Sequence, residues 1–221
     1  SKNIVSIEIK QSLIDRLIDH ADIVLEYRNG KLLKMINVSE FRENSNTLKH
    51  FIQHEYAGIG EGATQLISKG ENSHIEFKES LRFDKLKKIV NKDLERSVMK
   101  TIVGFLNTNG GNLLIGVSNE GHTIGLEEDY STLQRKNSDG FENHLNLLFK
   151  NYIGVSFAKY IDICFEKNEG KEICLIKIKS SHKPAFLKSD DKKEEFFIRT
   201  GNSTQPLSMS EADEYIRNHF K

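Results

Sequence analysis

The chain has 221 residues, of which 37% are hydrophobic and two are proline, so it can build one sizeable core or one core with a small appendage. Its 32 basic and 32 acidic residues give a formal net charge of zero, which excludes a positive field over the whole protein. No run is long and apolar enough to span a bilayer, and no signal peptide is visible. The chain begins at Ser1 without a methionine, which fits a trimmed product or a piece of a longer chain.

Residues 1–62 are predicted to form a helical appendage followed by a linker. A helical stripe over residues 4–27 is made by Ile9, Leu13, Leu17, Ala21 and Val24. A second helical run is predicted from Ser39 to Tyr56. The glycine-rich segment Ala57 to Ala63 formally fits the dinucleotide-binding fingerprint, which requires a strand before it. Because a helix is expected there instead, we interpret this segment as a flexible linker between two domains.

The main domain, residues 63–221, opens with a half-buried strand in the segment ENSHIEFKES. Strand alternation puts Ile75 and Phe77 on one face and Glu76 and Lys78 on the other. The open face of this strand therefore carries an acid and a base.

The segment Lys78 to Lys100 holds eight basic and four acidic residues and is predicted to be helix-like, with an apolar helical stripe in its second half. Two interpretations stay open, namely a solvated helix face on a sheet and a phosphate-facing patch beside the acidic strand. Phe105 to Asn109 then ends a helix, Gly110 and Gly111 stop it, and residues 112–117 are predicted to form a buried strand.

The rest of the chain favours one more long helix and several hairpins. An amphipathic helix is predicted within residues 129–151, and a hairpin joins residues 160–165 to 172–179 through a turn that contains Gly170. A last strand pair is predicted from residues 184–187 and 195–199. After the polar turn 200–206, Ser208 and Glu211 have the spacing of a capping box for a final helix. This order predicts an α+β domain with a mixed or antiparallel sheet and flanking helices.

The two cysteines, Cys164 and Cys174, lie on alternating strand segments without a C-x-x-C pattern. We interpret them as small core hydrophobes of a protein in a reducing cytoplasm, because neither a disulfide framework nor a metal spacing is present.

Four ordered motifs resemble the Schlafen AlbA-like domain family, over about Leu66 to Phe220. They are E-x-x-x-x-E-F-K from Glu71 to Lys78, F-x-N-T-x-G-G-x-L-L-I-G-V from Phe105 to Val117, the glycines Gly121 and Gly125, and F-F-I-R-T-G-N-S-T-x-P from Phe196 to Pro206. The resemblance implies a nucleic-acid-binding α+β fold. Many bacterial members are described as DNA-binding proteins or transcription regulators, so the resemblance implies a role in transcription control or in defence.

Some family members are metal-dependent endoribonucleases, which the resemblance offers as an alternative function. Two of their three acids correspond here to Glu71 and Glu76, which would hold Mg²⁺ or Mn²⁺, with Lys78 stabilising charge on the phosphate. The third acid falls on Asn119, and an amide supplies a hard cation only with a neutral carbonyl. Whether the chain is an enzyme is therefore left open.

Two further alternatives receive less support from the residues. Members of the family have also been described as ATPases, but the chain has no G-x-x-x-x-G-K-[ST] loop for ATP. The sequence contains no cluster of Cys and His residues with metal-ligand spacing, so we predict that the chain has no zinc site. The neutral charge makes a homodimer through a sheet edge a further prediction.

Nucleic-acid binding, to DNA or RNA, is predicted to depend on basic side chains and on a hydroxyl-bearing turn, because these groups neutralise or hydrogen-bond phosphates regardless of base sequence. The candidate residues are Lys78, Arg82, Lys87, Lys88, Lys177, Lys179, Lys183, Arg199, Ser203 and Thr204.

Overall fold

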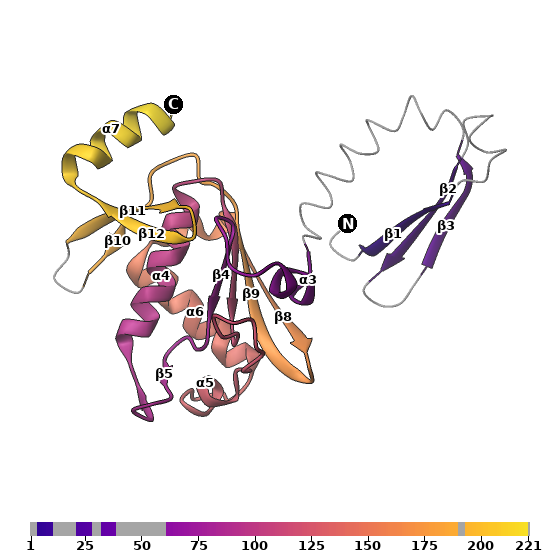
Figure 1. Cartoon of the computed structure of the whole chain (residues 1–221), viewed down its shortest axis with the longest axis horizontal. Coiled ribbons are helices and arrows are strands. Elements are labelled where there is room, and N and C mark those ends of the chain that lie inside the picture. The colour runs from indigo at the N-terminus through magenta and orange to yellow at the C-terminus, as the bar shows by residue number, and fades with distance from the viewer. Residues whose placement is uncertain (1–3, 11–20, 28–31, 39–60, 190–192, 221) are drawn as a thin grey trace. The chain divides into compact units, whose positions relative to one another are not determined.

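In the computed structural model, the chain divides into two units, Ser1–Gly62 and Ala63–Lys221 (Figure 1). The structure describes residues 4–10, 21–27, 32–38, 61–189 and 193–220.

In the first unit, the described residues form an antiparallel sheet with the order β1-β2-β3. The strands are β1 (Ile4–Lys10), β2 (Ala21–Tyr27) and β3 (Leu32–Val38). The prediction that these residues belong to a helical appendage is therefore wrong.

The apolar residues of the first unit fit two periods, which explains this error. Val5, Ile7 and Ile9 recur at every second position, and β-branched residues favour a strand. The pairing of neighbouring strands favours the two-residue period, and a search for helical periodicity in one segment does not take this pairing into account. The predicted helix 39–56 and residues 57–60 of the predicted linker lie outside the described residues, whereas Ala63, the last residue of that segment, begins α3.

The second unit is built on a four-stranded sheet with the order β4-β7-β9-β8. Its strands are β4 (Ile75–Lys78), β7 (Gly111–Ile115), β8 (Ile161–Asn168) and β9 (Lys171–Ile178). β4 runs parallel to β7, whereas β9 is antiparallel to both β7 and β8. This mixed sheet, with helices on its flanks, confirms the predicted α+β fold class.

Helices cover both faces of this sheet (Figure 1). The long helices α4 (Lys92–Leu106) and α6 (Ser138–Tyr152) bury the larger core cluster, to which Leu113 and Ile176 contribute. The short helix α3 (Ala63–Lys69) packs on the other face, in a cluster with Phe77 and Leu175. The sheet is thus the middle layer of the unit. Two short elements complete it, α5 (Glu127–Ser131) and the 3₁₀ helix η2 (Val155–Tyr160).

The connection from α4 to β7 requires a glycine. Gly110 has a φ of +73°, and a Cβ at this position would stand 2.4 Å from the carbonyl oxygen of Ile178. The predicted stop between helix and strand is therefore confirmed, and the close approach of β9 explains it.

A second sheet packs against α4 and holds the C-terminal part of the unit. It consists of β10 (Leu187–Lys188), β11 (Glu194–Thr200) and β12 (Ser203–Leu207), all antiparallel. The final helix α7 (Met209–His219) begins at Ser208, and both hydrogen bonds of the predicted capping box with Glu211 are present. β12 was not predicted, because its sequence STQPL reads as a turn.

A small hairpin precedes α4 and replaces part of the predicted helix-like segment. β5 (Phe83–Asp84) pairs with β6 (Ile89–Val90), so only the second half of the segment from Lys78 to Lys100 is helical. No helix among the described residues is long and apolar enough to cross a bilayer.

Candidate nucleic-acid interface

β4 pairs only with β7 among the described strands, so it forms an edge of the central sheet. Glu76 pairs with Leu113 and Lys78 with Ile115, and paired residues share a face. Glu76 and Lys78 therefore lie on the α4 side of the sheet. Phe77 is fully buried on the opposite side, which confirms the predicted alternation.

The carboxylate of Glu76 binds two cations. Its Oε1 accepts a hydrogen bond from Lys78 Nζ at 2.5 Å, and its Oε2 lies 2.7 Å from Arg199 Nη1 on β11. The side chain of Arg199 is 2% exposed, that of Glu76 13% and that of Lys78 25%. Lys78 is therefore the cation of this group that reaches solvent.

Arg199 also ties β11 to the turn before β4. Its Nη2 donates to the carbonyl oxygen of Asn72 at 2.8 Å, and its guanidinium lies over the ring of Phe105 at 5.0 Å from the centroid. Nη1 reaches the hydroxyl of Thr204 on β12 at 3.4 Å, a long contact. We call Glu71, Glu76, Lys78, Arg199 and Thr204 the β4 edge cluster.

Glu71 stabilises the turn that leads into β4. Its Oε1 accepts a hydrogen bond from the backbone N–H of Phe77 at 2.8 Å. The same turn is closed by a hydrogen bond from the N–H of Asn72 to the carbonyl oxygen of Ile75. The spacing of the two glutamates thus places one acid on the strand backbone and the other on a pair of cations.

Three of the four carboxylate oxygens of Glu71 and Glu76 already have other partners in this structure. Both oxygens of Glu76 bind cationic side chains, and one oxygen of Glu71 binds a backbone N–H. Asn119 is exposed in the turn after β7. Within the described part of the chain, no group of three His, Cys, Asp or Glu side chains could hold a metal ion. The metal site at Glu71 and Glu76 stays a prediction.

Arg82, another predicted phosphate ligand, is paired with a buried carboxylate. Its Nε lies 3.1 Å from Glu95 Oε1 on α4 without making a hydrogen bond, so the contact is ionic. His144 Nε2 on α6 lies 2.7 Å from the same oxygen. Glu95 on α4 therefore contacts both the loop before β5, through Arg82, and α6, through His144.

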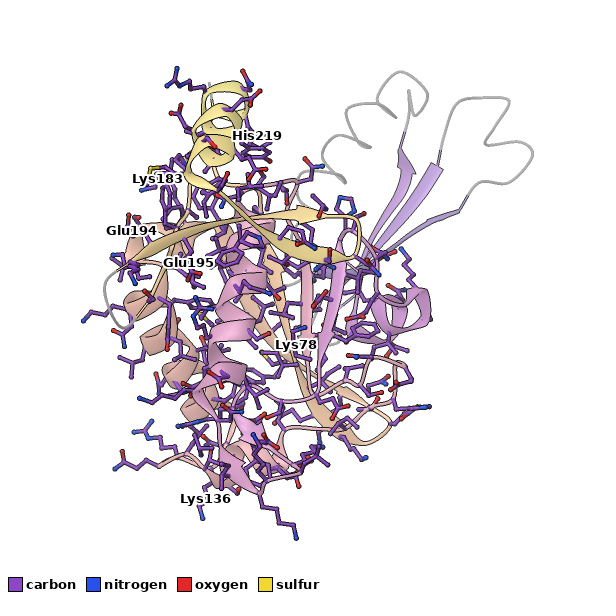
Figure 2. All side chains as sticks on the ribbon, turned by 60° about the vertical axis from the view of Figure 1, so that its left-hand side comes forward. Lys78, Lys136, Lys183, Glu194, Glu195 and His219 are labelled. Carbon is purple, nitrogen blue, oxygen red and sulfur yellow. The ribbon has the colours of Figure 1, made fainter. Side chains whose placement is uncertain are left out.

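The remaining predicted basic residues lie on several parts of the unit. Lys177 pairs with Asn112 in the sheet, one position out of phase with Glu76, so it lies on the α3 side. Lys179 is exposed just after β9. Lys183 lies over the ring of Phe157 and donates to the hydroxyl of Ser156. Figure 2 shows Lys78 and Lys183 at separate places on the molecule.

Lys87 and Lys88 lie elsewhere again, in the exposed turn between β5 and β6. The predicted residues thus do not share a single face. Glu76 bridges Lys78 and Arg199, and Arg199 in turn contacts Thr204.

A polar turn stands next to Arg199 in the chain. It joins β11 to β12, and Thr200, Gly201 and Asn202 are exposed there. The hydroxyl of Ser203 bridges the carbonyl oxygen of Thr200 and the side chain of Gln205. The turn presents hydroxyl and backbone groups of the kind that bind phosphate oxygens.

Two buried carboxylates that hold the loop between β4 and β5 were missed from the sequence, although each left a signal. Glu95 is 4% exposed and interrupts the apolar stripe of α4, where an acid needs a partner. Asp129 is 2% exposed, and its carboxylate accepts hydrogen bonds from the backbone N–H groups of residues 81–83. It stands in the first turn of α5, where sequence reasoning sees only a favourable helix start.

Several solved structures resemble part of the chain, and two of them illustrate the likeness. The DIP2311 protein from Corynebacterium diphtheriae is 18% identical, with a TM-score of 0.47 over 67% of this chain and 28% of that chain. The chain thus spans little more than a quarter of that structure. The N-terminal domain of a RecG-related protein from Nitrosomonas europaea is 22% identical, with a TM-score of 0.42 over 68% of this chain and 95% of that chain. No curated protein matches the chain.

The family model described as "Schlafen, AlbA_2" matches residues 71–208, which begin at Glu71 and include the whole β4 edge cluster. The match covers more than half of the chain. The chain belongs to the Schlafen AlbA_2 family.

Proposed function

We propose that residues 63–221 form a nucleic-acid-binding domain, and that Lys78 and the β11–β12 turn contact the phosphate backbone. The observation that carries the proposal is the position of Lys78, which Glu76 holds at the exposed rim of the β4 edge cluster. A lysine ammonium has three N–H donors. Glu76 takes one, and the other two have no partner among the described residues, so they are available for a phosphate.

Arg199 has a supporting part in this proposal. Its buried guanidinium holds Glu76 in place and keeps the β11–β12 turn beside β4. The side chain that would touch phosphate is then already ordered, which lowers the entropic cost of binding. Binding of this kind would serve transcription control or defence, the two roles that resemblance to the family implies.

The test measures the fluorescence anisotropy of labelled single-stranded RNA, single-stranded DNA and duplex DNA against salt concentration. We expect binding at low salt, and a log–log salt slope that falls by about one for Lys78→Gln, because one phosphate contact is lost. Lys167→Gln is the matched control, since Lys167 is an exposed lysine at the far end of the sheet.

Two results would contradict the proposal in different ways. Wild-type protein that retains none of the three polymers at low salt would remove nucleic-acid binding altogether. Equal affinities and salt slopes for the Lys78→Gln and Lys167→Gln variants would leave binding in place but remove the β4 edge cluster as its location. As a control, far-UV circular dichroism of each variant tests whether its fold is intact.

A further inference from the structure

The β5–β6 hairpin exposes several apolar side chains among lysines. Leu86 is 98% exposed, Ile89 53% and Val90 41%. Lys85, Lys87 and Lys88 surround Leu86 in the sequence. Single exposed apolar residues are ordinary on a protein surface. Here they are concentrated in residues 85–90, which we call the hairpin tip.

A rigid base supports the hairpin tip. The Asp129 carboxylate accepts hydrogen bonds from the hydroxyl of Ser80 at 2.7 Å and from the backbone N–H of Leu81 at 2.9 Å and of Phe83 at 3.1 Å. The N–H of Asn91 donates to the carbonyl oxygen of Arg82 at 2.8 Å and closes the hairpin. The exposed apolar residues therefore stand on an anchored stem.

The turn itself is also ordered by local hydrogen bonding. Asp84 Oδ1 accepts a hydrogen bond from the backbone N–H of Lys87 at 3.0 Å. Lys88 has a φ of +54°, a left-handed conformation that is uncommon for a residue other than glycine and is set by the tight turn. The shape of the hairpin tip is thus formed before any partner arrives, which favours binding.

The hairpin tip has a positive charge that is only weakly compensated. Lys85 lies 3.2 Å from Glu128 and Lys87 lies 3.8 Å from Asp84, and both pairs are open to solvent. Exposed pairs of this kind contribute little and are easily exchanged for another anion. Lys88 has no ion-pair partner within the described part of the chain. Figure 1 shows β5 at the end of the unit that lies away from β11 and β12.

We propose that the hairpin tip is a wing that enters the minor groove of duplex DNA, with its lysines on the phosphates and Leu86 against the base edges. The inference rests on the proposed function and adds a second contact surface to it. Lysine ammonium groups neutralise phosphates on either side of a groove. Aliphatic side chains are the wedges that minor-groove proteins insert, whereas single strands are bound by stacking on aromatic rings, which the tip lacks.

A membrane surface is the competing partner for a basic and apolar tip. Burial of one leucine side chain gives only marginal membrane attachment without a second anchor. On DNA the same burial adds to several phosphate contacts. Duplex DNA therefore fits the composition of the hairpin tip better than a bilayer does.

The experiment compares labelled duplex DNA, single-stranded DNA of the same sequence and phosphatidylserine–phosphatidylcholine vesicles. We expect the double variant Lys87→Gln with Lys88→Gln to lower the log–log salt slope on duplex DNA by about two. We expect Leu86→Ser to weaken duplex binding about tenfold with an unchanged salt slope, because it removes an apolar contact and no charge. Leu147→Ser, at a leucine that is 51% exposed on α6, is the matched control and should bind as wild type does.

The outcomes separate this inference from the proposed function. If Lys78→Gln weakens binding while the tip variants bind as wild type does, the proposed insertion of the hairpin tip is wrong and the proposed function stands. If wild-type protein binds no nucleic acid at low salt, both are wrong. If the tip variants weaken single-strand binding as much as duplex binding, or if Leu86→Ser abolishes vesicle binding while duplex binding is unchanged, the wing is also overturned.

Discussion

The pairing of Glu76 with Arg199 predicts that Glu76→Gln destabilises the second unit. Glutamine fills nearly the same volume, so the substitution removes charge and leaves packing almost unchanged. The guanidinium of Arg199, whose side chain is 2% exposed, would then lose its main anionic partner. Arg199 Nε already has no hydrogen-bond partner among the described atoms, so the charge has little other support.

The size of the effect follows from the burial of the pair. Removing one partner of a buried ion pair costs roughly 3–5 kcal/mol. Arg199 keeps its contacts to the carbonyl oxygen of Asn72 and to the ring of Phe105, and Glu76 itself is 13% exposed. We therefore expect a loss at the lower end, about 3 kcal/mol, which for a chain of this size lowers Tm by about 6–12 °C.

The measurement is thermal and urea unfolding followed by far-UV circular dichroism. Glu79→Gln is the control, because Glu79 is an exposed acid directly after β4 and the chemical change is identical. The double variant Glu76→Gln with Arg199→Met should lose less stability than the sum of the two single variants, since the pair acts as a unit. A Tm for Glu76→Gln equal to that of Glu79→Gln would refute the argument.

Three other substitutions test the packing around this site, each by the same unfolding measurement. Asn107→Ala should cost about 3 kcal/mol, since the fully buried amide hydrogen-bonds backbone groups of Ala185, before β10, and of Phe197 on β11 that would be left unpaired; a loss below about 1 kcal/mol would contradict this. Gly104→Ala should destabilise by about 1–3 kcal/mol, because its Cβ would lie 2.7 Å from Thr204 Cγ2, and Thr204→Ser should recover part of the loss; no recovery would show that the clash lies elsewhere. Ser208→Ala should cost about 1 kcal/mol of α7 capping. The Ser208 hydroxyl lowers the pKa of Glu211, so the cap is fully present above the ordinary pKa of a glutamate and is lost as the pH falls through the lowered value; Ser208→Ala should reduce this acid sensitivity, and an unchanged pH profile would count against the cap.

Local patterns predicted the elements that position the site. The alternation around Phe77, the glycine stop at Gly110 and the capping box at Ser208 each depend on residues close in the sequence, and each is confirmed. The strand β12 was missed because Thr204 to Pro206 has the composition of a turn, and only its pairing with β11 makes it a strand.

The partners of the arginines could not be predicted, because they come from distant elements. Arg199 meets Glu76 across 123 positions, and Arg82 meets Glu95 only because α4 folds back past the loop that follows β4. Charge counts along the chain cannot show which cations are neutralised in the fold. The count therefore overstated the basic surface in the segment from Lys78 to Lys100.

The distribution of the cations also bears on what the domain would recognise. The arginines of the candidate set, Arg82 and Arg199, are held by carboxylates inside the unit, and arginine is the side chain best suited to bidentate contacts with base edges. The cations left at the β4 edge cluster and at the hairpin tip are lysines, which act on phosphates as point charges. Phosphate contacts position a protein on nucleic acid but carry no sequence information. Under the proposed insertion of the hairpin tip, any base preference of this domain would come from Leu86 and from the shape of the groove.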